Sequence, residues 1–245
     1  MEYRNNRSKI PLPLGFILFL FAWLLAAPCA AAVPFDEEAE VKVDGKAAQQ
    51  SSGQKAETRI VVPSVWDGLE PQKNFLMSAF GVTSKNDDAE WKASELNTAN
   101  EVMADLPVIF RSATKGLVRV ESGSSDQVAG YVNMNEAPVI YMTNAGANYK
   151  VFPGYLVHEM THCFQMAQPK LLEAWEDTFW DSGFFGGSPK TPSVSAYGNS
   201  SAKEDMAESV RIYYMNGSSL KSSSPERYQF IKDKLMQGKE FGERD

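Results

Sequence analysis

Cysteine and histidine are scarce in this chain, which has two of each among its 245 residues. Cys29 lies in an N-terminal segment that we expect to be removed, and its loss would leave Cys163 as the only thiol. An internal disulfide is then excluded, even for an exported protein. Cys163 directly follows His162, but consecutive residues on a helix point about 100° apart. We therefore expect Cys163 to be a small buried side chain and not a metal ligand.

Long apolar runs are equally rare, and the only one lies near the N-terminus. It covers residues 14–27, follows three basic side chains and precedes a stretch of alanines. The run is shorter than the roughly 20 apolar residues that cross a bilayer. These features predict a signal peptide over residues 1–32, which indicates a secreted or cell-envelope protein without stable membrane insertion after cleavage. An uncleaved anchor and a lipid on Cys29 are weaker alternatives.

Basic side chains are fewer than acidic ones. Without residues 1–32 the chain keeps 21 Lys and Arg against 30 Asp and Glu, a net charge of −9. That charge argues against nucleic acids and anionic membranes as partners. Residues 33–57 are acidic and then polar, which predicts a flexible linker. Residues 58–245 are long enough to bury a core, and we expect them to form one domain that acts as a monomer.

The first half of this domain shows both strand and helix patterns. The β-branched residues at 59–65 predict a strand. Apolar side chains at helical spacing predict a helix over 89–106, capped by Asp87 or Asp88 and ended by Pro107.

Later segments complete an α+β pattern. Short strands are expected at 116–121 and 137–142, and a helix follows around the two histidines. Further helices are predicted at 171–181, 203–216 and 225–237. We thus expect a small N-terminal mixed sheet with helices and a mostly helical C-terminal subdomain, with the histidine helix between them.

The two histidines fall in the segment His158-Glu159-Met160-Thr161-His162, which apolar residues flank. Pro153 and Pro169 bracket a helix around it. At positions i and i+4 both imidazoles project from one face, where they can share a tetrahedral Zn²⁺ ion, and Glu159 can take a proton from water. The alternative is two ordinary histidines four residues apart. We favour the metal site because the only histidines of the chain both fall in this pattern.

A third protein ligand must be an acid, since no other histidine exists. Glu204 and Glu208 are four residues apart on a predicted helix, so Glu204 can bind the metal while Glu208 accepts a hydrogen bond from a ligand histidine. The segment from Ser201 to Glu204 also has the pattern of a helix capping box, with Glu208 on a solvated face. Other candidate acids stand on the preceding helix: Glu173, Glu176, Asp177 and Asp181.

Tyr197 lies seven residues before Glu204. A phenol near the metal can donate a hydrogen bond to the oxyanion of a tetrahedral intermediate. A tyrosine before a glycine is equally common as an ordinary turn residue.

With these residues in view, the chain resembles the peptidase domain of anthrax lethal factor and the secreted bacterial Pro-Pro endopeptidases, a gluzincin family. The similarity covers about the last 90 residues. It rests on the histidine segment, on the spacing of Tyr197 and Glu204, and on the segments 204–209, 213–216 and 220–230. Aromatic residues often fill the family's positions that Asp205 and Met206 occupy here, and an acid at the first could alter the metal environment.

The resemblance implies a zincin-like fold. It also implies that His158, His162 and Glu204 bind zinc, that Glu159 is the general base and that Tyr197 stabilises the oxyanion. In zincin-type peptidases a sheet-edge strand before the metal helix pairs with the extended substrate, so residues 137–142 are where we expect the peptide. An ordinary core strand is an equally good interpretation of that segment.

Two functions follow. The first is an exported zinc-dependent endopeptidase that hydrolyses peptide or protein substrates, with proline-containing extracellular proteins suggested by the resemblance. The second is a non-catalytic exported domain that keeps the zincin fold and uses zinc as a structural staple or serves protein interaction. Glu159 favours the first, because a purely structural zinc site has no use for a base.

Overall fold

The computed structural model describes residues 59–123, 128–133, 138–148, 150–181, 183 and 187–244, which belong to one compact unit, Lys55–Asp245. The predicted signal peptide and linker, residues 1–32 and 33–57, lie outside the described residues. In the part that is described, no helix combines the length and the apolar character needed to cross a membrane.

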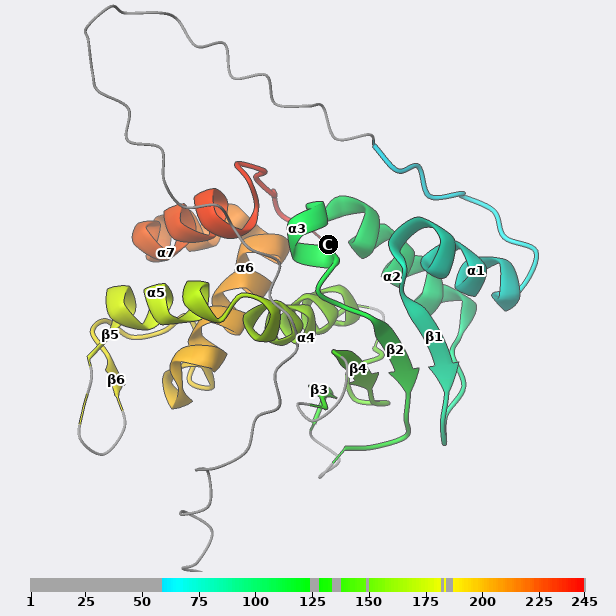
Figure 1. Cartoon of the computed structure of the whole chain (residues 1–245), viewed down its shortest axis with the longest axis horizontal. Coiled ribbons are helices and arrows are strands. Elements are labelled where there is room, and N and C mark those ends of the chain that lie inside the picture. The colour runs from blue at the N-terminus through cyan, green and yellow to red at the C-terminus, as the bar shows by residue number, and fades with distance from the viewer. Residues whose placement is uncertain are drawn as a thin grey trace, which may run out of the picture. The chain divides into compact units, whose positions relative to one another are not determined.

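A four-stranded mixed sheet forms the N-terminal half, in the order β1-β2-β4-β3 (Figure 1). The strands are β1 (Thr83–Asn86), β2 (Gly116–Arg119), β3 (Gly130–Val132) and β4 (Val139–Met142). β1, β2 and β4 are parallel, and β3 is antiparallel to β4 at one edge. Leu117, Ile140 and Met142 are fully buried on one face, as the alternation of side chains along a strand requires.

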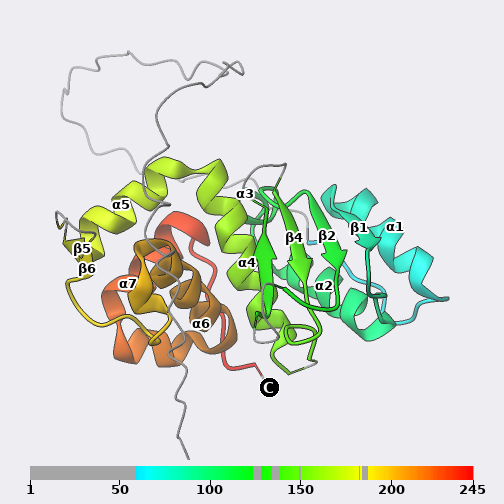
Figure 2. The same cartoon turned by 90° about the horizontal axis from the view of Figure 1, so that it is seen from below.

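Helices cover the buried face of the sheet. They are α1 (Leu69–Phe80), α2 (Ala93–Asp105), the short α3 (Val108–Arg111) and α4 (Phe152–Ala167). Pro153 stands in the first turn of α4, where its missing N–H costs no hydrogen bond, and Pro169 begins the next helix. Figure 2 shows α4 running between the sheet and the C-terminal helices. The predicted α+β architecture is confirmed at this level.

The C-terminal half is mostly helical. Its elements are α5 (Pro169–Phe179), β5 (Trp180–Asp181), β6 (Ser188–Pro189), the 3₁₀ turn η1 (Gly198–Ser200), α6 (Ala202–Ser223), α7 (Pro225–Phe230) and the π-helical turn η2 (Ile231–Leu235). The helix predicted over 203–216 continues to Ser223 with a kink at Asn216, which leaves helical geometry at φ −153° and ψ 73°. Gly217 is needed beside this kink because a Cβ there would lie 2.3 Å from the carbonyl oxygen of Phe241.

Two predictions for the first half are wrong. Residues 59–65 pair with none of the described strands, and Val61 and Val65 are 76% and 84% exposed, because their β-branched side chains have no strand beside them to pack against. The helix predicted from Ala89 begins at Ala93, and its N-cap is Lys92, whose N–H donates to Glu95. Asp88 instead accepts a hydrogen bond from the N–H of Glu121 at 2.7 Å, which ties it to the sheet. The end of the helix before Pro107 is confirmed.

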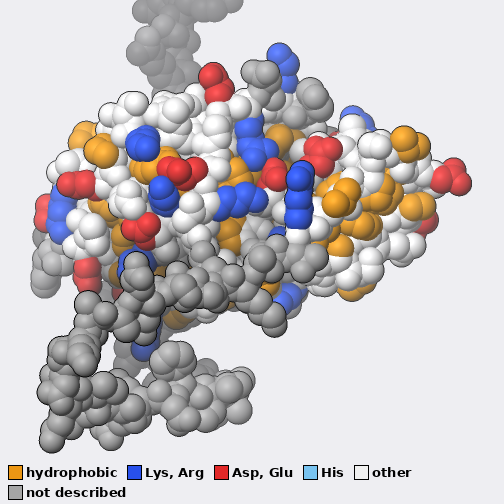
Figure 3. Space-filling view, turned by 90° about the horizontal axis from the view of Figure 1, so that it is seen from above, with side chains coloured by type: hydrophobic (Ala, Val, Ile, Leu, Met, Phe, Trp, Pro, Cys, Tyr) orange, Lys and Arg blue, Asp and Glu red, His pale blue; other side chains and the backbone are white. Residues whose placement is uncertain are grey.

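The outer surface mixes charges of both signs. On the face in Figure 3, Lys and Arg side chains lie among Asp and Glu, and hydrophobic side chains gather toward the end where α1 and α2 lie. Met77 on α1 and Ile109 on α3 are exposed apolar side chains, at 46% and 39%.

Asp205 joins three elements of the helical half and is fully buried. Its carboxylate accepts hydrogen bonds from the indole N–H groups of Trp175 on α5, at 3.2 Å, and Trp180 on β5, at 2.9 Å. Arg227 on α7 donates to it from Nη2 at 3.0 Å. The buried ion pair is therefore fully hydrogen-bonded, which is the condition under which such a pair is tolerated in a protein interior.

Replacement of Asp205 by Asn should lower the free energy of unfolding by about 3–5 kcal/mol, because the buried Arg227 charge loses its counterion. Urea denaturation of the metal-free protein measures this. The matched control is Glu70→Gln, which breaks the exposed Lys73–Glu70 pair and should cost less than about 0.5 kcal/mol. Equal small effects of both substitutions would contradict the role assigned to Asp205.

Candidate metal centre

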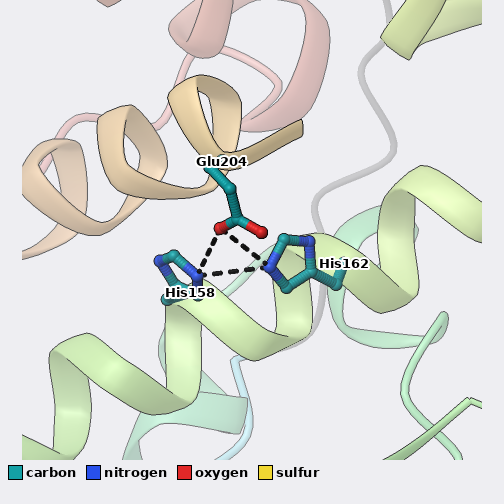
Figure 4. Close-up of side chains that lie close together, drawn as sticks. All are labelled: His158, His162 and Glu204. Carbon is teal, nitrogen blue, oxygen red and sulfur yellow. Dashed lines mark hydrogen bonds and ion pairs between the residues drawn. The ribbon is translucent and has the colours of Figure 1, made fainter. Parts of the chain in front are cut away.

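The histidines project from one face of α4 toward the N-terminal turn of α6, as Figure 4 shows. His158 is 5% exposed, and its Nε2 atom lies 3.2 Å from the Nε2 atom of His162. Their spacing of four residues on a regular helix produces this approach. The geometry expected of the His158–His162 segment is therefore present.

Glu204 comes to the histidines from the first turn of α6. Its Oε2 atom lies 3.2 Å from Nε2 of His158 and 3.4 Å from Nε2 of His162. Ser201 caps α6 by accepting a hydrogen bond from the backbone N–H of Glu204 at 3.2 Å. Only the serine half of the predicted capping box is present, because the carboxylate of Glu204 faces the histidines. Glu208 is 5% exposed, so the interpretation that places it on a solvated face is wrong.

The three facing atoms fit a shared metal ion. Tetrahedral zinc with bonds of about 2.0–2.1 Å separates its ligand atoms by about 3.3 Å, and the distances in the cluster are 3.2, 3.2 and 3.4 Å. The Oε2 atom of Glu204 is buried and has no hydrogen-bond partner among the described residues. In the described part of the chain, His158, His162 and Glu204 are the group of His, Cys, Asp and Glu side chains that could hold a metal.

The second nitrogen of His158 is bound as expected. Nδ1 donates to Oε1 of Glu208 at 3.0 Å, because a carboxylate can only accept. Glu208 also accepts from Nε and Nη2 of Arg211, at 2.8 and 2.9 Å. The predicted contact of Glu208 with a ligand histidine is thus present. Arg211 was not predicted from the sequence, although it stands three residues after Glu208 on the same helix.

The second nitrogen of His162 has a neutral partner. Nδ1 donates to Oε1 of Gln165 at 3.0 Å, and the amide nitrogen of Gln165 donates to the carbonyl oxygen of Lys203 at 2.9 Å. Gln165 is 5% exposed. This residue was not predicted from the sequence either. Its spacing of three residues from His162 on one helix was the available signal.

Contacts between the histidines and the carboxylates oppose the effect of burial in the metal-free cluster. Burial lowers the pKa of His158, but the contacts with the carboxylates of Glu204 and Glu208 together outweigh burial and raise this pKa to about 9. Burial raises the pKa of Glu204, whereas contacts with His158 and His162 bring it down to about 2. The pKa of Glu208 is lowered as well, because contacts with His158 and Arg211 exceed the effect of burial.

Glu159 is buried between α4 and the edge strand β3. A Cβ on Gly130 of β3 would lie 3.0 Å from Cγ of Glu159 and 3.2 Å from its Oε1 atom. Glycine therefore lets the strand approach this carboxylate. Burial raises the pKa of Glu159, and the two histidines oppose the shift.

Tyr197 lies beside the cluster, and its ring centroid is 6.0 Å from that of His158. Burial raises the pKa of Tyr197 to about 12, and Glu204 and Glu159 add to the shift. The phenol therefore keeps its proton at neutral pH and is able to donate a hydrogen bond. The residue as a whole is 59% exposed.

The remaining candidates lie elsewhere. Cys163 is fully buried, as expected, and burial raises its pKa to about 12. The four acids of the preceding helix, Glu173, Glu176, Asp177 and Asp181, are not in the cluster. Asp205 is bound to Arg227 and two tryptophans, not to the metal ligands.

Of the two interpretations of residues 137–142, the edge strand is wrong and the ordinary core strand is confirmed. The strand expected to bind peptide at the edge, over residues 137–142, is β4, and it lies inside the sheet between β2 and β3. Periodicity does not reveal strand order. β3 occupies the edge next to Glu159.

No protein-family model matches the chain, and neither a curated protein nor a solved structure matches it.

Loss of the Glu204 carboxylate should weaken metal binding most. We expect Glu204→Ala to lower zinc affinity more than 100-fold, and Glu208→Ala to lower it about 10- to 100-fold because it removes only the support of His158. Competition with a chromophoric chelator measures both. Glu173→Ala is the control and should bind like the unchanged protein. Normal zinc binding by Glu204→Ala would overturn this ligand set.

Metal binding should also release a proton. With a pKa of about 9, metal-free His158 holds a proton at pH 7.5, and a metal must displace it. Glu204 is already ionised there and releases none. Titration calorimetry in buffers of different ionisation enthalpy should count at least one proton at pH 7.5, and the contribution of His158 should fall as pH rises through 9. A count near zero at pH 7.5 would contradict the assignment.

Proposed function

We propose that this protein is an exported zinc-dependent endopeptidase with a zincin-like fold. The observation that carries the proposal is the position of Glu159. Glu159 stands between the two ligand histidine candidates in the sequence of α4, and its carboxylate lies against the edge strand β3. A metal site that only staples the fold has no need of a carboxylate at this place.

The donor set supports zinc as the metal. Two imidazole nitrogens and one carboxylate oxygen are the ligands of several catalytic zinc sites, which leave a further coordination position open. His158, His162 and Glu204 would hold the ion, while Glu208 and Gln165 orient the imidazoles. A bound zinc ion supplies Lewis acidity, which acidifies water and polarises a carbonyl group.

Glu159 and Tyr197 then have separate tasks. Glu159 accepts a proton from the attacking water as the C–O bond forms and the carbonyl oxygen becomes an oxyanion, and it then gives this proton to the nitrogen of the leaving amine as the C–N bond breaks. Tyr197 donates its phenolic proton in a hydrogen bond to the oxyanion. The products are a carboxylate and an amine.

The edge strand β3 is the proposed binding site for the peptide backbone. An extended substrate can add to the free edge of this strand by main-chain hydrogen bonds. That places the scissile bond beside Glu159, because Gly130 of β3 lies against this carboxylate. The preference for proline-containing extracellular proteins rests on the family resemblance, and the predicted signal peptide supports export.

Glu159→Gln should keep zinc and lose hydrolysis. The amide has nearly the same shape but accepts no proton, so kcat should fall by at least about 10²- to 10⁴-fold. Mass spectrometry of a proteome-derived peptide mixture incubated with residues 33–245 measures cleavage, and metal analysis measures zinc. Glu173→Gln serves as the control with unchanged cleavage. Undiminished cleavage by Glu159→Gln would end this mechanism, whereas one zinc per chain without hydrolysis by the unchanged protein would favour the non-catalytic alternative.

Tyr197→Phe should lower kcat by about 10²- to 10³-fold, because one donor to the oxyanion is lost. KM should change little, since the oxyanion forms only in the transition state. Steady-state kinetics on a peptide found in the mixture separates the two constants. A change confined to KM would assign Tyr197 to substrate binding instead.

A further inference from the structure

Gln165 connects the two helices that carry the metal ligands. It stands on α4, one turn after His162, and its side chain reaches the backbone of α6 at Lys203. Lys203 directly precedes Glu204. The amide group of Gln165 therefore contacts the imidazole ring of His162 and the peptide bond that precedes Glu204.

The hydrogen bonds define the orientation of each group. The amide nitrogen of Gln165 can only donate, and its partner is the carbonyl oxygen of Lys203 at 2.9 Å. The amide oxygen can only accept, so the Nδ1 atom of His162 carries the proton of the 3.0 Å contact. In the neutral ring the Nε2 atom then has a free lone pair, and this atom faces His158 and Glu204.

Burial gives these contacts their importance. Gln165 is 5% exposed, so water offers little replacement for either bond. An apolar side chain of similar length would fill the same space, yet it would leave Nδ1 of His162 and the carbonyl of Lys203 without this partner. The ring could then rotate and α6 could shift, and both movements would displace ligand atoms now 3.4 Å apart.

We propose that Gln165 is a positioning residue of the metal centre, which directs Nε2 of His162 toward the metal and holds the first turn of α6 so that Glu204 reaches it. The role differs from that of Glu208, which supports His158 with a charged group from the helix that carries Glu204 itself. The inference rests on the metal centre proposed above.

The test compares Gln165→Met, Gln165→Glu and the control Gln72→Met. Gln72 is a buried glutamine on α1, at 2% exposure, and has no part in the metal centre. Zinc affinity is measured by chelator competition, stability by urea denaturation of the metal-free proteins, and ligand geometry by the visible absorption of the Co²⁺ forms.

Gln165→Met should bind zinc about 10- to 100-fold more weakly and show altered Co²⁺ bands. Gln165→Glu should lose less affinity, because the carboxylate still accepts from His162 although it no longer donates to Lys203. Gln72→Met should keep the affinity and the spectrum, even where it unfolds more easily.

Several outcomes would overturn the proposal. They are zinc affinity of Gln165→Met within about threefold of the unchanged protein, an equal loss in Gln72→Met, or a loss in Gln165→Glu as large as in Gln165→Met. An unchanged protein that binds no zinc would instead defeat the metal centre itself, so the two failures are distinguishable. If Gln165→Met does not fold, the zinc affinity and the Co²⁺ spectrum of Gln165→Glu still test the proposal.

Discussion

Three electron-rich atoms face one another between α4 and α6, and the surrounding structure is arranged around that contact. Both imidazoles donate from Nδ1, to Glu208 and to Gln165, so both Nε2 atoms point their lone pairs at the carboxylate of Glu204. Three such atoms within 3.4 Å repel unless a cation or a proton lies among them. In the metal-free protein a proton on His158 relieves this repulsion, which is consistent with the raised pKa of His158. A bound metal ion would relieve the same repulsion in place of the proton, so metal binding and proton release would be linked.

Local patterns in the sequence are enough to predict most of the cluster. His158, Glu159 and His162 depend on helical spacing alone, and so does the pairing of Glu204 with Glu208 four residues later. The rule that a ligand histidine has a partner for its other nitrogen predicted a bond from one of the histidines to Glu208, and in the structure this histidine is His158. The approach of α6 to α4 could be inferred as well, because the metal requires a third ligand and few acids were available.

Features that depend on distant parts of the chain were not predictable in this way. Asp88, a capping residue chosen from sequence, instead accepts a hydrogen bond from Glu121, which follows the neighbouring strand β2. Strand order decided that β3, not β4, forms the edge beside Glu159. Gln165 looks like any helix residue until its contact with Lys203 is seen. In most of these cases the deciding partner is remote in sequence.

The buried carboxylate of Asp205 influences the orientation of Glu204, the next residue toward the N-terminus, without contacting the candidate metal ligands. Successive residues of a helix are rotated by about 100°, so Asp205 and Glu204 must face different sides of α6. Because Arg227, Trp175 and Trp180 hold Asp205 from the side of α5 and α7, they set the angle of rotation of α6 about its own axis. With this rotation the side chain of Glu204 points toward the histidines. The direction of the candidate ligand Glu204 is thus determined by the hydrogen bonds of Asp205 on another side of the same helix.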